Sequence, residues 1–175
     1  MEEYVDILDE WTGEVTGEIK TKKEAHRIGL WHGAIHIWVI SPDKKRILLQ
    51  RRCADKALFP NMWDISVGGH ISAGEDSLVS AKRELSEELG LDDTKYNFEY
   101  VDRIKEKFEY EDILSNEFVT IYEIVSDVDI ESITLQKEEV SEARWFTKEE
   151  FNTLIQNEEI INHLEEYDMI NNILE

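Results

Sequence analysis

GHISAGEDSLVSAKRELSEELGL, residues 69–91, carries the strongest structural signal in this chain. Apolar residues recur in it at intervals of three and four, which is the period of one buried helix face. They are Leu78, Ala81, Leu85 and Leu89. Gly90 follows, at the position where a left-handed residue commonly ends a helix. The spacing therefore predicts a helix from Ser77 to Leu89.

Three glutamates of this helix, Glu84, Glu87 and Glu88, lie within one turn of each other. Residues three and four apart share a helix face, so we expect the three carboxylates to converge on one edge. Like charges this close repel unless a cation neutralises them, and carboxylate oxygens suit Mg²⁺ or Mn²⁺. Taken alone, an acidic helix run is more often a solvated face. The fixed offsets of Gly69 and Glu75 ahead of the helix favour the metal site.

The residues that accompany these glutamates have expected tasks of their own. Gly69 and Gly74 let the backbone turn tightly before the helix begins. Glu75 either caps the helix N-terminus or holds the preceding loop. Arg83 can brace one of the carboxylates.

In full, the segment is identified as a Nudix box, because nine positions stand at the offsets of that motif. They are Gly69, Glu75, Arg83, Glu84, Leu85, Glu87, Glu88, Gly90 and Leu91. The resemblance implies the Nudix fold, an α/β architecture. It also implies hydrolysis, dependent on Mg²⁺ or Mn²⁺, of a phosphoanhydride bond in a nucleoside di- or triphosphate or another nucleoside diphosphate derivative.

The resemblance also implies roles for single residues. Glu87 and Glu88 are the leading metal ligands, and Glu84 is the next ligand or the base, with Arg83 beside them as a catalytic residue. Further carboxylates outside the box are common in the family, and either candidate can equally be a surface acid. The full expected metal set is Glu84, Glu87, Glu88, Gly69 and Glu117, with Glu139 as the alternative base.

Substrate contacts are expected from basic residues near the box. Arg51 and Arg52 end a predicted strand, and a guanidinium fork matches phosphate oxygens. Strand-end arginines are also often merely solvated. His70 follows Gly69 directly and is expected beside the substrate. Four aromatic residues either stack on a base or belong to the core, namely Trp31, Phe59, Trp63 and Tyr110.

Stretches outside the box resemble the Nudix branch close to isopentenyl-diphosphate isomerase, over roughly residues 3–150: HRIGLWHGAIHIWVI, LLQRR, LFPNMWDISVGGH and EVSEARWF. A rival function is therefore double-bond migration in a prenyl diphosphate. The isomerases place a catalytic cysteine where this chain has Val67. Their sequences also depart from the RExxEE pattern, which is intact in this chain. The only cysteine, Cys53, lies well before that strand and is interpreted as structural. Both departures favour hydrolysis.

Some metal-site features of the isomerases remain. His26, His32 and His70 fall close to their histidine ligands, and Glu117 matches one of their carboxylates, while Ser115 replaces another. A second, histidine-rich metal site and simple packing near the pocket both stay open. A third class, a binding module without catalysis, would require a broken box, and this box is intact.

Composition limits the remaining classes. The 175 residues suit one domain with its own core, and the formal charge of −21 disfavours nucleic acid and anionic membranes as partners. The charge is uneven, because residues 20–56 hold ten basic and three acidic residues, either a solvated surface or a phosphate-facing wall. The single cysteine, and the absence of a signal peptide or membrane span, predict a cytoplasmic protein. A small-molecule diphosphate is the expected partner, and a homodimer stays open.

The remaining pattern predicts a mixed β-sheet between helices. Alternation in the first 25 residues indicates a hairpin, and residues 32–40 and 46–52 read as a second one. Further strands are expected at 64–70, 98–108, 117–125 and 142–146, with closing helices after the Thr147/Glu150 capping box and at 162–174. We divide this single domain into an N-terminal hairpin extension (1–27), a Nudix core (28–150) and C-terminal helices (151–175).

Overall fold

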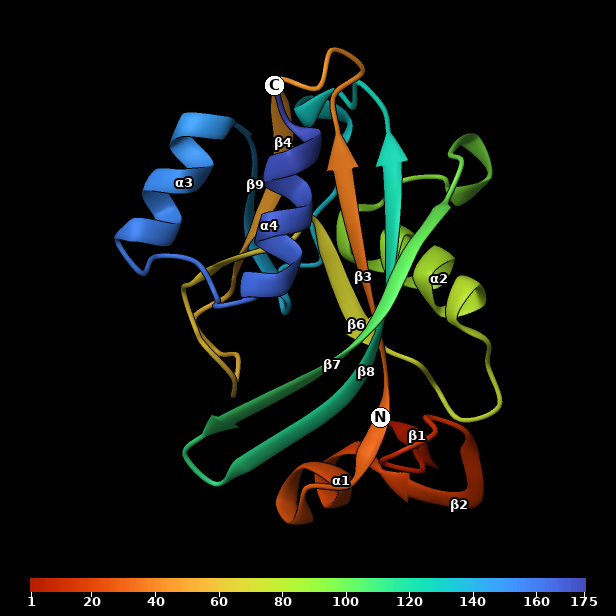
Figure 1. Ribbon diagram of the computed structural model, residues 1–175. Helices are drawn as coiled ribbons and strands as arrows, with labels where there is room; N and C mark the ends of the chain where they lie inside the picture. Colours follow the sequence, from red (N-terminus) through yellow and green to blue (C-terminus); the bar gives the residue numbers. More distant parts are fainter.

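The computed structural model describes residues 1–175 and shows helices on both faces of a central sheet (Figure 1). The elements follow in the order β1 (Tyr4–Leu8), β2 (Val15–Thr21), α1 (Lys22–Ile28), β3 (Trp31–Ile40), β4 (Arg46–Arg52), β5 (Trp63–Asp64), β6 (Val67–His70), α2 (Ser77–Leu89), η1 (Asp93–Lys95), β7 (Glu99–Tyr110), β8 (Ile113–Val125), η2 (Ile130–Ser132), β9 (Val140–Thr147), α3 (Lys148–Gln156) and α4 (Leu164–Ile173). The α/β class and the N-terminal hairpin are confirmed.

The main sheet is mixed. Its central path is β5-β4-β3-β8-β7, with β6 paired to β3 and β9 paired to β4. The β3 and β8 strands run parallel along ten residue pairs, whereas every other pairing is antiparallel. The predicted β3–β4 hairpin is present, yet only two residue pairs join these strands. Most of β3 is therefore held by β8 and β6.

Two layers of apolar contact lie on opposite faces of β3. Successive strand residues point to opposite faces, so Trp38 packs toward α3 and α4 while Ile35 and Ile37 pack toward Leu85 of α2. All ten residues of β3 are buried, as a central strand covered on both faces requires. The same alternation turns His36 toward the α4 side.

Both predicted ends of α2 are confirmed. The Asp76 side chain accepts a hydrogen bond from the Val79 amide, and Gly90 ends the helix with φ 63°. Glu75 is therefore not the cap, and of its two expected tasks it performs the second, holding the loop. The cap sets where α2 begins, and the buried Leu85 and Leu89 determine which side of the helix faces the sheet. Figure 1 shows α2 lying beside the sheet.

Some of the helices and strands differ in detail from those predicted from the sequence. Helix α1, capped by Thr21, follows the N-terminal hairpin and was not predicted. The predicted 64–70 strand is divided into β5 and β6. The capping box of α3 is present, with hydrogen bonds in both directions between Thr147 and Glu150. None of the helices is both long enough and apolar enough to traverse a lipid bilayer.

Candidate functional site

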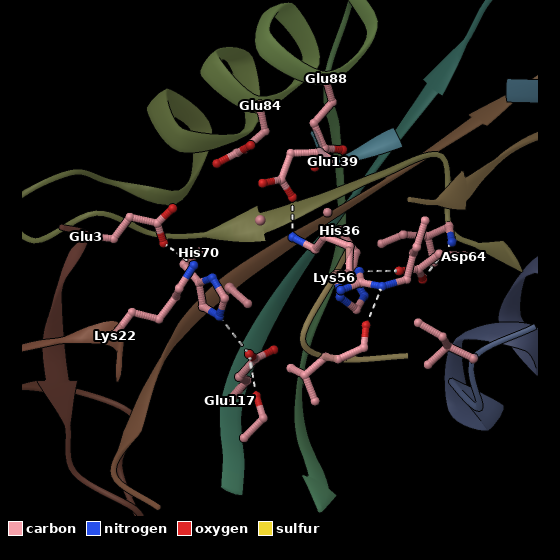
Figure 2. A pocket seen from close by; sticks show the side chains of 18 of the residues that line it. Glu3, Lys22, His36, Lys56, Asp64, His70, Glu84, Glu88, Glu117 and Glu139 are labelled. Atoms are coloured by element: carbon pink, nitrogen blue, oxygen red, sulfur yellow. Dashed lines mark hydrogen bonds and ion pairs between the residues drawn. The ribbon is translucent and has the colours of Figure 1, made fainter. Parts of the chain in front are cut away.

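A polar cleft lies between α2, the sheet and the N-terminal hairpin (Figure 2). Three of the four Nudix-box glutamates, Glu84, Glu87 and Glu88, line it, together with Glu139 from the segment before β9. Its walls also include basic side chains from distant parts of the chain, namely Lys22, Arg52, Lys56 and Arg83. The cleft therefore places carboxylates and cations around one space.

Glu84 and Glu88 are withdrawn from solvent. The Glu88 residue is 6% exposed and its carboxylate accepts a hydrogen bond from Gln50 Nε2 at 2.7 Å. Burial, reinforced by neighbouring Glu84, raises the pKa of Glu88 to about 8. Burial likewise raises the pKa of Glu84 to about 7, although Arg83 opposes the shift. Two close carboxylates that resist ionisation fit a site where a divalent cation replaces protons.

Gly69 makes room for the Glu84 side chain. A Cβ atom built on Gly69 would lie 2.6 Å from both Cγ and Oε1 of Glu84. Only glycine therefore lets Glu84 lie against β6, which explains why the motif begins with this residue. No side chain of Gly69 exists to bind a metal, so its expected place in the metal set is limited to its backbone.

Arg83 braces several groups at once. Its guanidinium donates to Glu84 Oε1 at 2.6 Å, to Glu75 Oε2 at 3.4 Å and to the His70 carbonyl at 3.3 Å. Glu75 also accepts from Ser80 at 2.7 Å. These contacts tie the loop before α2 to the helix itself. Arg83 thus contacts the Glu84 carboxylate directly, and its expected catalytic role stays a prediction.

Glu87 differs from its two neighbours. Its side chain is 49% exposed and reaches only Arg83, at 3.5 Å. The predicted convergence of three carboxylates is therefore uneven, because Glu87 lines the cleft from its rim. A flexible glutamate at this place can move toward an ion without disturbing the core.

The basic wall is partly paired. Lys56 forms an ion pair with Glu139, and Lys22 forms one with Glu3 (Figure 2). Arg52 lines the cleft but donates to Asp64 at 3.2 Å and to the Leu58 carbonyl. Of the predicted arginines, Arg51 does not line the cleft. Its guanidinium is bound to the Asn61 carbonyl at the surface, so this expected phosphate contact has no support from the geometry.

Three histidines meet Glu117 at the N-terminal side of the cleft. His26, His32, His70 and Glu117 offer ligand atoms that lie within 4.8 Å of one another. Glu117 accepts from His70 Nε2 at 3.0 Å and from Ser115 at 2.7 Å. We call this group the histidine site.

Burial favours the neutral form of two rings at the histidine site, those of His26 and His70. Burial lowers the pKa of His26 to about 4, helped by His70 and His32, and burial also lowers the pKa of His70. Although burial opposes it, His32 and His70 lower the pKa of Glu117 well below its usual value. The Nε2 atoms of His26 and His32 are buried without a hydrogen-bond partner. The neutral rings of His26 and His70, and the unpaired buried nitrogens of His26 and His32, fit a divalent metal.

A second group of ionisable side chains closes the other side of the cleft, where Figure 2 shows His36 and Asp64. His36, Glu106, His163 and Glu166 again offer ligand atoms within 4.8 Å of one another. We call them the C-terminal cluster. None of them was predicted from the sequence, because they come from β3, β7 and the start of α4 and follow no local spacing.

Of the other residues singled out from the sequence, some line the cleft and others are buried away from it. Phe59 lines the cleft, whereas Trp63 packs on Phe146 in the core. Cys53 is buried and bonded to the Glu138 carbonyl, as expected for a structural thiol. Val67 is fully buried, and neither it nor Cys53 lines the cleft.

Known proteins resemble this chain along most of its length. The NUDIX domain family matches residues 30–166. Nudix hydrolase 3 of Arabidopsis thaliana is 41% identical over 162 residues, 90% of this chain and 21% of that protein. A Nudix hydrolase of Listeria monocytogenes is 37% identical over 165 residues, 92% of this chain and 89% of that protein. The chain thus spans about a fifth of the plant relative and nearly all of the bacterial one.

Solved structures show the same fold. A Deinococcus radiodurans crystal structure superposes with a TM-score of 0.75 at 23% identity and covers 99% of this chain and 100% of that one. The NUDIX domain of a Shewanella oneidensis protein, solved with ADP ribose, gives a TM-score of 0.57 at 16% identity, over 77% of this chain and 82% of that one. With a complete motif, a matching family and these relatives, the chain belongs to the Nudix hydrolases, enzymes that cleave pyrophosphate bonds.

Proposed function

We propose that this chain hydrolyses a phosphoanhydride bond in a nucleoside di- or triphosphate or another nucleoside diphosphate derivative, with Mg²⁺ or Mn²⁺ bound by Glu84, Glu87 and Glu88. The observation that carries the proposal is the withdrawn pair Glu84 and Glu88 with raised pKa values. The bound ADP ribose of the Shewanella protein supports the substrate class, since that ligand is a nucleoside diphosphate derivative.

The chain's own residues divide the work of such a reaction. When bound, the divalent ion supplies Lewis acidity toward the pyrophosphate oxygens and lowers the pKa of an attacking water. Arg83 holds the Glu84 carboxylate in place, and Lys22, Arg52 and Lys56 offer positive charge to the phosphates. Glu84 is either the third ligand of the ion or the base that accepts a proton from the attacking water, and Glu139, which also lines the cleft, is the alternative base.

The histidine site is the place that we propose for a second divalent ion. Its orphaned Nε2 atoms on His26 and His32 support this, together with the adjacent Glu117 carboxylate. The His32→Gln chain should bind one Mn²⁺ fewer than the wild-type chain. An unchanged Mn²⁺ count would assign these histidines to packing instead.

A substrate panel tests the proposed reaction. Nucleoside diphosphates, nucleoside triphosphates, nucleotide sugars and dinucleotides are incubated with Mg²⁺, and products are separated by chromatography. We expect turnover that excess chelator abolishes and that Glu88→Gln lowers by at least about 100-fold. The control is Glu149→Gln, which removes an exposed carboxylate on α3 and should retain full activity. Full wild-type turnover in chelator would refute the metal-dependent mechanism.

Isopentenyl diphosphate belongs in the same panel, because of the resemblance to the isomerase branch. Val67 stands where the isomerases place their catalytic thiol, and no cysteine lines the cleft. We therefore expect no double-bond migration. Rapid isomerisation followed by nuclear magnetic resonance would favour the isomerase function over hydrolysis.

A further inference from the structure

The C-terminal cluster is a buried meeting point of β3, β7 and the last helix. The His36, His163 and Glu166 residues are 6%, 5% and 0% exposed. His36 Nδ1 lies 2.5 Å from Glu166 Oε1, and His163 Nδ1 lies 2.6 Å from Glu106 Oε1. Two imidazoles and two carboxylates are thus gathered in one small volume, well removed from the Nudix-box helix in sequence.

Two of the four cluster residues, His163 and Glu166, are held by a partner outside the cluster. His163 Nε2 lies 3.0 Å from Asp64 Oδ1, and Asp64 accepts from Arg52 at 3.2 Å. Trp38 Nε1 donates to Glu166 Oε2 at 2.7 Å, which leaves Oε1 turned toward the cluster. Carboxylate-to-histidine contacts of this kind are the usual outer support of a metal ligand. The arrangement therefore resembles a prepared coordination set rather than a chance contact of charges.

Two observations indicate that the cluster lacks a cationic partner. Glu106 Oε2 is buried without a hydrogen-bond partner. In addition, three largely buried carboxylates, on Asp64, Glu106 and Glu166, face only one permanent cation, Arg52. The remaining negative charge requires either two protonated imidazoles or one divalent cation, because an uncompensated buried charge is strongly unfavourable.

We propose that His36, Glu106, His163 and Glu166 bind one Zn²⁺ ion, in a site separate from the Nudix box and from the histidine site. Two imidazole nitrogens and two carboxylate oxygens form a four-ligand set that Zn²⁺ accepts in tetrahedral geometry. Mg²⁺ prefers six oxygen ligands and keeps several waters, so a cluster in which two of the four ligands are imidazole nitrogens disfavours it. The ion joins α4 to β3 and β7.

Such an ion would complete one wall of the cleft. His36, Glu106 and His163 all line the cleft, while Glu166 lies behind them in α4. Binding would therefore fix α4 against the sheet at the place where a substrate's organic part can lie, next to Phe59 and Phe108. Its role is structural support of that wall, and no reaction step passes through it.

Zinc counting on matched variants tests the site in solution. The full-length wild-type, Glu166→Gln and Glu165→Gln chains are stripped of metal, dialysed against Zn²⁺ and measured by atomic emission. We expect Glu166→Gln to lose one Zn²⁺ per chain, because the neutral amide cannot supply an anionic ligand. Glu165→Gln changes the exposed neighbour on the same helix and should keep the wild-type count. Equal counts in all three chains would overturn the proposal.

Diffraction at the zinc edge tests the unmodified chain, so that a folding defect in a variant cannot decide the outcome. Crystals grown with Zn²⁺ should show an anomalous peak about 2.0–2.2 Å from His36 and His163 ring nitrogens. Peaks at the Nudix box or the histidine site alone would show that the C-terminal cluster is only a protonated charge network. That result would overturn the proposal and leave the proposed hydrolase function intact.

Discussion

At the scale of single residues, burial of the Glu88 carboxyl makes the stability of the fold depend on pH. Its pKa is raised to about 8 in the fold, above its ordinary value of 4.5. A carboxyl whose folded pKa is raised stabilises the fold below pH 4.5, and this contribution is lost as pH rises from 4.5 through about 8. The metal-free chain is therefore destabilised by Glu88 at high pH, where the carboxylate is charged without a counter-ion.

The Glu88→Gln chain should consequently be more stable than the wild type at about pH 9 in chelator. We expect a gain of about 1–3 kcal/mol in the free energy of unfolding, because the neutral amide needs no counter-charge. At about pH 4 the two chains should be similar. Urea unfolding at both pH values measures the difference. A variant that is less stable than wild type at the higher pH would contradict the assigned burial of charge.

Gly69 provides a second test at the residue scale. In Gly69→Ala the added methyl would meet the Glu84 side chain and displace its carboxylate. We expect kcat to fall by about 100-fold, since a shift of about 1 Å at a reacting group has effects of that order. Gly68→Ala is the matched control on the same strand, because its nearest contact would be the flexible end of Ile65 at 3.0 Å. Equal losses of kcat in both variants would show that the effect comes from distortion of β6 and not from displacement of the Glu84 carboxylate.

At the scale of elements, a capping box stabilises the start of α3. Thr147 accepts from the Glu150 amide, and the Glu150 carboxylate accepts from the Thr147 amide. Thr147→Ala should lower the free energy of unfolding by about 1 kcal/mol. Thr153→Ala, later in the same helix, should change it much less. Thermal unfolding compares the two, and kcat should remain unaltered because neither threonine lines the cleft.

The elements also explain which predictions succeeded. Helix α2 and the capping box of α3 were predicted because each depends on residues three or four apart, which interact whatever surrounds them. Helix α1 was not predicted, since its seven residues carry only a short apolar pattern. The 64–70 strand is broken because β5 pairs with β4 and β6 pairs with β3, and no local residue pattern specifies that change of partner.

At the scale of the whole molecule, the formal charge of −21 makes the stability of the fold depend on ionic strength. Repulsion among like charges disfavours the compact state, and salt screens it. Raising NaCl from about 0.01 M to about 0.15 M shortens the Debye length from about 30 Å to about 8 Å. We expect the melting temperature of the metal-free chain to rise over this interval, which calorimetry measures.

Mg²⁺ should stabilise the wild-type chain beyond this general screening. At matched ionic strength, a rise in melting temperature with MgCl₂ that exceeds the rise with NaCl indicates binding to the folded state. The extra rise should be much smaller in Glu88→Gln. Equal responses of both chains would show that Mg²⁺ acts only as a screening ion.

The division of the single domain into an N-terminal extension, a core and C-terminal helices stays a prediction.

The sequence by itself determined the family and the helix that carries the Nudix-box glutamates, because both depend on residue offsets along one short segment. Only the tertiary structure decided that Arg51 lies outside the cleft, that Glu87 stands at its rim, and that His36 meets Glu166 across 130 positions of sequence. Contacts of this second kind arise from sheet register and helix packing. Those depend on the whole core rather than on any local spacing.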